Sequence, residues 1–447
     1  MLLKDLNGKS ICILGYGREG KAMVDAIREF APEAEITIAD QNDQLRVACP
    51  ELSRRAGCEL QVGENYLENL KRFDVVIKSP GIPPKVLATR NPQPATVTNS
   101  TQIFLEEAAA RGATVIGVTG SKGKSTTSSL IYEILKAAQK KSFLVGNIGD
   151  PAISHLKDAT LNTFFVQEMS SYQLMDCTVS PHVAVITSFF PEHLDYHASA
   201  SRSSVSTPLE AYKEAKSHIS RFQNEEDFVI YDVASAGAEE IAALSPGKRI
   251  AAHAEDLPLQ SMELKGEHNR RNAAIAFLTT RLLGIPERIS IPVIQQFRGL
   301  PHRLQSLGIH HGIEWVDDAI STTPESTIAA LDALGDRVTT IILGGQDRGN
   351  DFTELGKRIA ASKIKTVILF PGSGLRIRKA IEEAKAVVKF CEVGAMQEAV
   401  ETAKSQIANR KSQIVPIVLL STSSPSYNMF KNFEEKGDAF KNAIHII

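Results

Sequence analysis

The sequence has few cysteines and no strong excess of charge of either sign. Its five cysteines lie far apart and form no C-x-x-C pair, which argues against both a disulfide framework and a zinc ribbon. The formal net charge is −2, so no electrostatic signal favours nucleic acid or an anionic membrane as a partner. We therefore expect reduced thiols, a cytoplasmic location, and neither a nucleic-acid nor a membrane partner.

Long hydrophobic runs are also missing. No apolar stretch approaches the length of about 18 residues that a membrane-spanning helix needs. The N-terminal stretch "MLLKDLNGKS" is too polar for a signal peptide. With 447 residues, of which 43% are hydrophobic, the composition is instead typical of a globular protein of about three domains.

Short β-rich runs alternate with helical stretches along most of the chain. Examples are "SICILG", "EITIAD" and "FDVVIKSPG", then "TFFVQEM" and "HVAVITS", and finally "TTIILGG", "KTVILF" and "IVPIVLLST". This alternation predicts βαβ units with parallel sheets. We expect an α/β protein with domains at 1–98, 99–302 and 303–447. The Pro- and Asn-rich stretch 90–100 is the expected linker out of the first domain, and the segment "RGLPHR" at 298–303 is the next expected boundary.

A glycine-spaced turn follows the first β-rich run. Gly15, Gly17 and Gly20 form the pattern G-x-G-x-x-G, a weak dinucleotide-binding signal whose geometry suits any pyrophosphate. Asp40 ends the next predicted strand, where a dinucleotide enzyme has its ribose-binding acid. A nicotinamide dehydrogenase is therefore one alternative, but it would give no role to a second glycine loop further along the chain.

This second loop, "GVTGSKGKSTTSS", has the order strand, loop and helix. Gly120 and Gly123 leave room for backbone N–H groups to face an anion at the positive end of the helix. Lys124 can reach the phosphates of a nucleotide, and the Ser125 hydroxyl suits Mg²⁺. The glycine spacing departs from the strict Walker form, so a plain turn that joins two elements is the alternative.

Further candidate ligands follow two predicted strands and a predicted helix. Glu168 and His193 each end a β-rich run, and Lys213 and Lys216 fall on the helical stretch "PLEAYKEAKSHI". A carboxylate oxygen and an imidazole nitrogen are suitable cation ligands, and ligands of open α/β sheets bind at strand ends. The ordinary alternative is a surface glutamate, a hydrogen-bonded loop histidine and solvated lysines.

Taken together, these stretches resemble the Mur ligases of peptidoglycan synthesis, a family of ATP-dependent amide-forming enzymes. The resemblance rests on "TGSKGKSTT", "QEMSSYQL", "FFPEHLDYH", "YKEAK", "GEHNRRNAAIA", "GLPHR" and "LGGQDRGNDF". It implies a Rossmann-like N-terminal domain, a P-loop mononucleotide-binding central ATPase domain and a Rossmann-like C-terminal domain. "SPSYNMFKNFEEKGDAF" and "GYGREG" look most like the branch that adds D-glutamate to UDP-N-acetylmuramoyl-L-alanine.

The resemblance implies roles for the second glycine loop and its neighbours. Lys124 would grip the phosphates of ATP, and Ser125 and Glu168 would bind one Mg²⁺. His193 and Lys216 would serve a second Mg²⁺, with Lys216 carbamylated so that a cation becomes a carboxylate. The other positions that match nucleotide-binding residues are Gly120, Ser121, Lys122, Gly123, Thr126, Asn269, Asn272, Arg303 and Asp318.

In this family the first glycine loop holds the uridine nucleotide of the substrate, so no dinucleotide cofactor is expected. His302 matches a position near the reacting groups. We expect a monomer that uses UDP-N-acetylmuramoyl-L-alanine, ATP and glutamate. The positions that match substrate-binding residues are Gly15, Tyr16, Gly17, Arg18, Asp40, Gln41, Ser79, Gly81, Asn147, Ser170, Thr322, Arg348, Ser426 and Phe433.

Two lysines of the family's glutamate pocket are replaced, by Ile320 in "DDAIST" and by Arg348 in "GGQDRGND". Arginine can still bind a carboxylate through two N–H groups, whereas isoleucine cannot. Some family members join L-glutamate, so the stereochemistry of the acceptor stays open, and the resemblance predicts D-glutamate. The remaining alternatives are folylpolyglutamate synthetase, the meso-diaminopimelate-adding ligase and a non-enzymatic, nucleotide-gated binding module.

Overall fold

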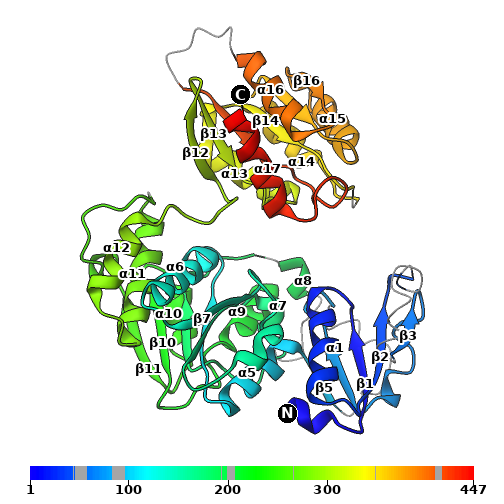
Figure 1. Cartoon of the computed structure of the whole chain (residues 1–447), viewed down its shortest axis with the longest axis vertical. Coiled ribbons are helices and arrows are strands. Elements are labelled where there is room, and N and C mark those ends of the chain that lie inside the picture. Colours follow the sequence, from blue (N-terminus) through cyan, green and yellow to red (C-terminus); the bar gives the residue numbers. More distant parts are fainter. Residues whose placement is uncertain are drawn as a thin grey trace. The chain divides into compact units, whose positions relative to one another are not determined.

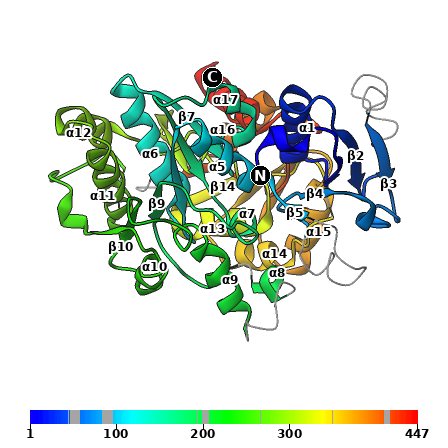
Figure 2. The ribbon, with the colours of Figure 1, turned by 90° about the horizontal axis from the view of Figure 1, so that it is seen from below.

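The computed structural model describes residues 1–43, 45, 58–82, 96–192, 194–198, 207–264, 266–347, 349–407 and 415–446. These residues form three β-sheets flanked by helices (Figures 1 and 2). The chain divides into two compact units, Met1–Phe297 and Arg298–Ile447. The first unit holds two of the sheets and the second unit holds the third. The mixed α/β fold class expected from the alternating pattern is confirmed.

The first sheet has five parallel strands in the order β3-β2-β1-β4-β5. Because β1 lies between β2 and β4, the direction of winding changes at β1, and ligands of open α/β sheets bind at such a point. The elements are β1 (Ser10–Leu14), α1 (Arg18–Phe30), β2 (Glu35–Asp40), β3 (Glu59–Val62), β4 (Val75–Lys78) and β5 (Thr96–Thr98), with 3-10 turns at Leu3–Leu6 and Leu70–Arg72.

One expectation is wrong at the end of this sheet. Residues 90–100 were expected to form a linker, but Thr96–Thr98 pairs with β4 as an edge strand, and a helix begins at Ser100. The β-branched residues Thr96, Val97 and Thr98 suit an edge strand, which the neighbouring prolines conceal in the sequence. Residues 90–95 lie outside the described part of the chain.

The second sheet has six parallel strands in the order β11-β10-β9-β6-β8-β7. Its strands are β6 (Thr114–Thr119), β7 (Lys141–Gly146), β8 (Thr163–Glu168), β9 (Val183–Ile186), β10 (Phe228–Asp232) and β11 (Lys248–Ala252). The helices are α5 (Ser100–Ala110), α6 (Lys124–Ala137), α7 (Ser171–Leu174), α8 (Leu194–Ala198), α9 (Pro208–Ser217), α10 (Ala236–Ala242), α11 (Glu267–Leu282) and α12 (Glu287–Gln296), with 3-10 turns at Ala152–Asp158 and Ala254–Asp256.

A single apolar core joins the first two sheets. It contains Leu6 and Ile27 from the N-terminal region and Phe104 and Phe165 from α5 and β8. A separate core contains buried residues of β6, α6 and α11, and these two helices pack against each other. Because the first core continues across both sheets, the N-terminal sheet is held against the central domain by buried apolar surface.

The third sheet has the order β12-β13-β17-β14-β15-β16, in which the β12–β13 pair is antiparallel and the other pairs are parallel. Trp315 on β13 packs against Phe440 in the C-terminal helix, with ring centroids 5.8 Å apart. The elements are β12 (Gln305–His310), β13 (Ile313–Asp317), α13 (Pro324–Leu334), a 3-10 turn (Gly335–Arg337), β14 (Val338–Leu343), α14 (Thr353–Ala360), β15 (Thr366–Leu369), α15 (Gly374–Glu383), β16 (Lys389–Glu392), α16 (Met396–Ile407), β17 (Ile417–Leu420) and α17 (Phe433–Ile446).

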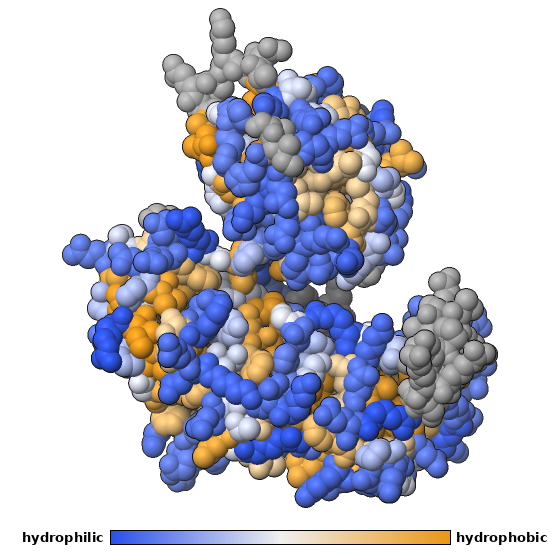
Figure 3. Space-filling view, viewed as in Figure 1, coloured by the Kyte–Doolittle hydropathy of each residue, from blue (hydrophilic) through white to orange (hydrophobic). Residues whose placement is uncertain are grey.

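Hydrophilic residues cover much of the molecular face in Figure 3, while the apolar residues of the strands are buried. Within the described ranges, no helix combines the length and apolar character that crossing a membrane requires. The described cysteines, Cys12, Cys58, Cys177 and Cys391, are free thiols, as the scattered spacing predicts.

Candidate functional site

The second glycine loop connects β6 to α6 at the carboxyl edge of the central sheet. Gly123 is the N-cap of α6 and has a left-handed backbone with φ of 88°. A Cβ atom at this position would lie 2.4 Å from Oδ1 of Asn272, so the loop approaches α11 too closely for a larger residue. Ser125 and Thr126 lie in the first turn of α6, where free backbone N–H groups favour an anion.

Two lysines converge on the backbone of this loop. Lys124 Nζ donates hydrogen bonds to the carbonyls of Gly120 and Ser121, each at 2.8 Å. Lys216 Nζ, on α9, also donates to the Gly120 carbonyl at 2.8 Å. Lys216 is only 2% exposed, and burial together with the charge of Lys124 lowers its pKa well below the usual value. The alternative that Lys216 is a solvated surface lysine is therefore wrong.

The other predicted nucleotide-binding residues of the first unit surround the loop. Ser121 Oγ donates to the carbonyl of Phe190 at 2.8 Å, which ties the loop to the segment after β9. Lys122 is exposed and forms an ion pair with Glu192. On α11, Asn272 Nδ2 donates to Oδ1 of Asn269 at 3.5 Å, so both amides lie on the helix face that approaches Gly123.

Glu168 ends β8 and is 1% exposed, so it is not the surface charge of the ordinary alternative. Its Oε1 accepts a hydrogen bond from Asn147 Nδ2 at 2.6 Å, and its Oε2 is buried with no hydrogen-bond partner in the described residues. A buried carboxylate oxygen without a partner fits a ligand for a hard cation such as Mg²⁺. The described residues contain no cluster of three or more His, Cys, Asp or Glu side chains that could hold a metal. His193 lies outside the described residues.

A second site lies at the carboxyl ends of β1 and β4, at the winding change of the first sheet. It is a cavity of about 490 Å³ that brings together many of the predicted substrate-binding residues. Gln41 does not line it, although it follows Asp40 directly. The predicted residues in its wall are Gly15, Tyr16, Gly17, Arg18, Asp40, Ser79, Gly81, Asn147 and Ser170.

Hydrogen bonds fix the walls of this cavity. Asp40 accepts from the backbone N–H of Tyr16 at 2.6 Å, so it orders the glycine turn. Ser79 Oγ donates to the carbonyl of Gly15 at 2.8 Å and joins the turn to the end of β4. A Cβ at Gly20 would lie 2.2 Å from the carbonyl of Gly15, so this glycine permits α1 to pack closely on the turn.

Several residues of the cavity wall were missed by the sequence analysis. Glu19 lies inside the glycine motif, and that position is the one signal that could have identified it. Tyr172 and Gln173 belong to the matched segment "QEMSSYQL", in which only two residues were assigned roles. The further unassigned residues in the wall are Pro80, Ile82, Gly146 and Pro151.

In the second unit, His302, Asp317 and Asp318 lie together around the end of β13. His302 Nδ1 lies 2.7 Å from Oδ2 of Asp317, and this hydrogen bond raises the pKa of the imidazole. Asp318 accepts from Ser421 Oγ at 2.7 Å, yet burial raises the pKa of its carboxyl to about 6. Arg303, which follows His302, lowers the pKa of Asp318 by a smaller amount.

One of the predicted glutamate-binding residues lies beside His302. The Phe433 ring lies 6.2 Å from the His302 ring, and the backbone N–H of Ile320 donates to the His302 carbonyl at 3.1 Å. Ser426 is buried, and its Oγ has no hydrogen-bond partner within the described ranges, so a ligand oxygen could pair with it. Thr322 lies directly before the N-cap of α13, and Arg348 lies outside the described residues.

Comparison with known proteins gives the family of the chain. The Mur ligase middle domain matches residues 118–254, and the Mur ligase, glutamate ligase domain matches residues 302–419. A UDP-N-acetylmuramoyl-L-alanine--L-glutamate ligase from Salinispora tropica is 34% identical, over 99% of each chain. A UDP-N-acetylmuramoylalanine--D-glutamate ligase from Acetivibrio thermocellus is 30% identical, over 99% of this chain and 98% of the relative.

Solved structures show the same fold at low sequence identity. The MurF ligase from Thermotoga maritima in complex with ADP has a TM-score of 0.51 and 14% identity, covering 99% of this chain and 97% of its own. The predicted resemblance is confirmed by both family domains and by relatives that match along almost the whole length. The chain belongs to the Mur ligase family of ATP-dependent, amide-forming enzymes.

Proposed function

We propose that the chain is an ATP-dependent ligase that joins glutamate to UDP-N-acetylmuramoyl-L-alanine in the synthesis of peptidoglycan precursors. In this proposal residues 1–98 hold the uridine nucleotide, residues 99–302 hold ATP, and residues 303–447 hold glutamate. The names of the full-length relatives support it, since both are ligases that act on an N-acetylmuramoyl-alanine substrate and glutamate. We further propose a monomeric, cytoplasmic enzyme.

The observation that carries the proposal is the hydrogen bond between Asn147 and Glu168. Asn147 lines the cavity at the glycine turn, and Glu168 belongs to the residues around the phosphate loop. The 2.6 Å bond between their side chains links the proposed uridine site to the proposed ATP site within one compact unit. An enzyme that activates a carboxylate of a uridylated substrate with ATP needs these two sites side by side. A nicotinamide dehydrogenase would need only the first.

The proposed reaction has two steps. The alanyl carboxylate of the UDP-linked substrate attacks the γ-phosphorus of ATP, which releases ADP and forms an acyl phosphate. The amine of glutamate then attacks the acyl carbon, phosphate leaves, and the amine loses a proton as the amide forms. Phosphoryl transfer depends mainly on positioning and on neutralisation of charge. Lys124 and the N-terminus of α6 would position the phosphates and neutralise their charge.

The residues of the loop also fit Mg²⁺. Ser125 and the unpartnered Oε2 of Glu168 would hold one ion, and Lys216, once carbamylated, would contribute to a second together with His193. Bound Mg²⁺ would neutralise phosphate charge that this near-neutral chain does not balance by itself. Carbamylation of Lys216 requires a neutral amine, and the lowered pKa of this buried lysine favours that form.

The enantiomer of glutamate divides the proposal into two candidates. The sequence resemblance predicts D-glutamate, and the relative from Acetivibrio thermocellus is named for it. L-glutamate is the second candidate, because the 34% identical relative is named for the L form and Ile320 replaces a lysine of the glutamate pocket. Relatives named for each enantiomer match almost the whole chain, so the experiment below assigns the hand of the acceptor.

The deciding experiment measures phosphate release from ATP with Mg²⁺ and UDP-N-acetylmuramoyl-L-alanine, adding pure L- or D-glutamate. We expect release that requires both the UDP-linked substrate and one enantiomer, and a product whose mass equals the sum of substrate and glutamate less one water. Phosphate release in the absence of glutamate would contradict the proposal. So would the absence of phosphate release with both enantiomers. A change in nicotinamide absorbance on adding NAD would support the dehydrogenase instead.

A further inference from the structure

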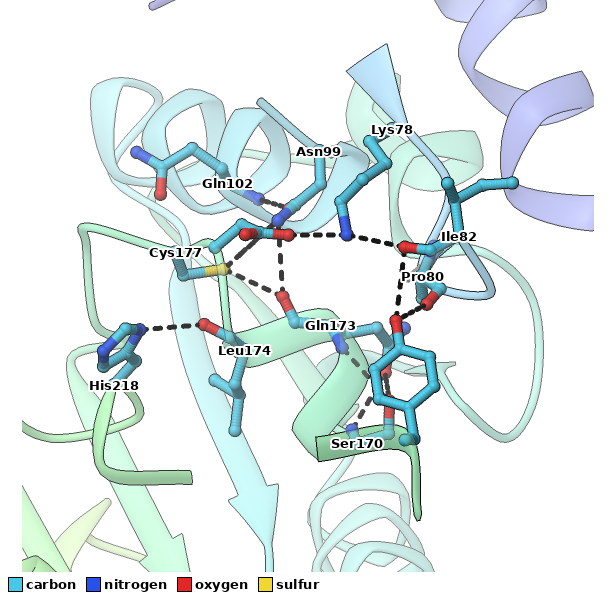
Figure 4. A network of polar contacts seen from close by, with 12 residues as sticks. Lys78, Pro80, Ile82, Asn99, Gln102, Ser170, Gln173, Leu174, Cys177 and His218 are labelled. Carbon is cyan, nitrogen blue, oxygen red and sulfur yellow. Dashed lines mark hydrogen bonds and ion pairs between the residues drawn. The ribbon is translucent and has the colours of Figure 1, made fainter. Parts of the chain in front are cut away.

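An ion pair between a buried lysine and a half-buried aspartate joins the N-terminal sheet to the central domain beside the proposed uridine cavity. Lys78, the last residue of β4, is 2% exposed, and its Nζ lies 2.7 Å from Oδ2 of Asp176 in the turn after α7. The same amine donates to the carbonyl of Ile82 at 3.1 Å, and Figure 4 shows the Lys78 side chain pointing at this carbonyl. One ammonium group therefore holds both a residue of the central domain and the backbone of the cavity wall.

The segment held by this pair is part of the cavity. Residues 79–82 follow β4 directly and line the cavity beside the glycine turn, where Ser79 Oγ donates to the Gly15 carbonyl. Their backbone is also fixed by Tyr196 of α8, whose hydroxyl donates to the carbonyl of Pro80 at 2.8 Å and reaches that of Ile82 at 3.3 Å. The conformation of this wall is thus set by side chains that approach from outside the cavity.

The segment that contains Asp176 also contacts the glycine motif through α7. Gln173 of α7 donates through Nε2 to Oε1 of Glu19 at 3.1 Å, and Ser100 Oγ donates to the other oxygen of this carboxylate. Glu19 lies in the first turn of α1, within the glycine motif, and lines the cavity. Through Gln173 and Asp176, the segment 171–176 therefore contacts Glu19 directly and residues 79–82 by way of Lys78.

We propose that Lys78 and Asp176 are a positioning pair for the UDP-linked substrate, which set residues 79–82 in the conformation that binds it. The identity of this ligand rests on the proposed function. Lys78 acts through the Ile82 backbone, so the pair fixes the shape of the wall in advance of binding. Because residues 79–82 are already ordered in the free protein, substrate binding loses little free energy to ordering them. Loss of the pair therefore weakens binding of this substrate alone.

A purely structural role makes a different prediction. Removing one partner of a buried ion pair leaves an uncompensated charge, whereas replacing both by apolar residues is often neutral for folding. The double variant Lys78→Met with Asp176→Leu should therefore keep the folding stability of the wild type. It still lacks the donor to the Ile82 carbonyl, so a positioning role predicts that its binding of the UDP-linked substrate stays weak.

The test measures binding of UDP-N-acetylmuramoyl-L-alanine by calorimetry and the KM values for this substrate and for ATP. Lys78→Met, Asp176→Asn and the double variant should weaken substrate binding by about tenfold, equivalent to about 1.4 kcal/mol, with the KM for ATP unchanged. Lys78→Arg, which keeps a cation and its donors, should restore most of the affinity. Thermal unfolding of each variant separates loss of binding from loss of fold.

The matched control is the ion pair between Lys141 and Asp158, which joins two partly exposed residues of the central domain at 3.1 Å. Lys141→Met and Asp158→Asn should leave both KM values unchanged. Unchanged substrate affinity in the double variant would overturn the positioning role, even if the single variants fail to fold. If the wild type itself does not bind the UDP-linked substrate, the proposed function fails. Equal binding by the wild type and the variants would instead overturn only the positioning role.

Discussion

The side-chain amine of Lys216 donates a hydrogen bond to the carbonyl of Gly120 at 2.8 Å, the same carbonyl that accepts from Lys124. Two ammonium groups on one carbonyl repel each other, and Lys216 is buried as well. Both effects lower its pKa, burial being the larger. The neutral amine is the form that reacts with carbon dioxide, so the geometry of the loop favours carbamylation of this lysine.

Lys216→Arg should therefore lose activity although it keeps a long basic side chain. Arginine stays charged and does not form a carbamate, so we expect kcat to fall by about 100-fold or more, in a phosphate-release assay. Since protonation removes the reactive amine, the wild type should lose carbamylation as the pH falls. The control is Lys213→Arg on the same helix, whose side chain pairs with Glu240. Wild-type turnover by the Lys216 variant would exclude a carbamate.

Lys124→Ala should abolish ATP-dependent phosphate release. Lys124 is the first residue of α6, and its amine lies against the carbonyls of the loop that would face the phosphates. We expect a loss of at least about 100-fold in kcat/KM for ATP, because a charge-assisted contact to the transferred group is removed. Lys136→Ala, near the other end of the same helix, is the control and should keep full activity. Near-normal turnover by the Lys124 variant would remove the loop from the mechanism.

Much of the fold and part of the site follow from local sequence patterns. Apolar runs such as "SICIL" and the two glycine loops predict strands, turns and helix starts, because these depend on neighbours in the chain. The partners of Lys78 and Glu19 could not be predicted this way. Asp176 is 98 residues from Lys78 (176 − 78), and nothing in the local pattern of either residue indicates the other.

Burial of charged residues was equally hidden. Lys216 falls on a helical stretch that suits a solvated face, and only the packing of α9 against the phosphate loop buries it. Lys436 was missed for the same reason, since it looks like one of several charges in "KNFEEKGDAF". In each case the side chain finds its polar partner on an element distant in sequence, which only the tertiary fold determines.

Asp317→Asn should lower the pKa of His302. In the wild type the hydrogen bond from the imidazole to Asp317 raises this pKa above its usual value, and asparagine has no charge to stabilise the imidazolium. A raised pKa in the folded state means that the charged histidine stabilises the second unit at low pH. That contribution is lost as the pH rises through the folded-state pKa.

Titration of His302 by NMR in wild type and variant would measure the effect. We expect the His302 pKa to fall in Asp317→Asn. In a plot of activity against pH, the limb that depends on ionisation of His302 should then lie at lower pH in the variant than in the wild type. A His302 pKa that is equal in wild type and variant would show that Asp317 does not raise the pKa of His302.

Lys436 should make the stability of the second unit depend on alkaline pH. This lysine is 1% exposed, donates to Thr422 Oγ1 at 2.5 Å, and has its pKa lowered by burial from 10.5 to about 8. Between pH 8 and 10.5 the unfolded chain binds a proton at this position that the folded chain does not, so folding becomes more favourable as the pH rises. The stabilising contribution is complete above pH 10.5 and is lost as the pH falls through 8.

Trp315 is the single tryptophan and is buried beside Phe440 of the C-terminal helix, so its fluorescence reports unfolding of the second unit. We expect the free energy of urea unfolding of the wild type, relative to Lys436→Met, to rise by about 3 kcal/mol between pH 7 and pH 11. The exposed Lys441 on the same helix is the control, since its ammonium remains hydrated in the folded state. A pH-independent difference between wild type and Lys436→Met would mean that Lys436 keeps its proton when buried, which would require the neighbouring Asp317 and Asp318 to offset its burial completely.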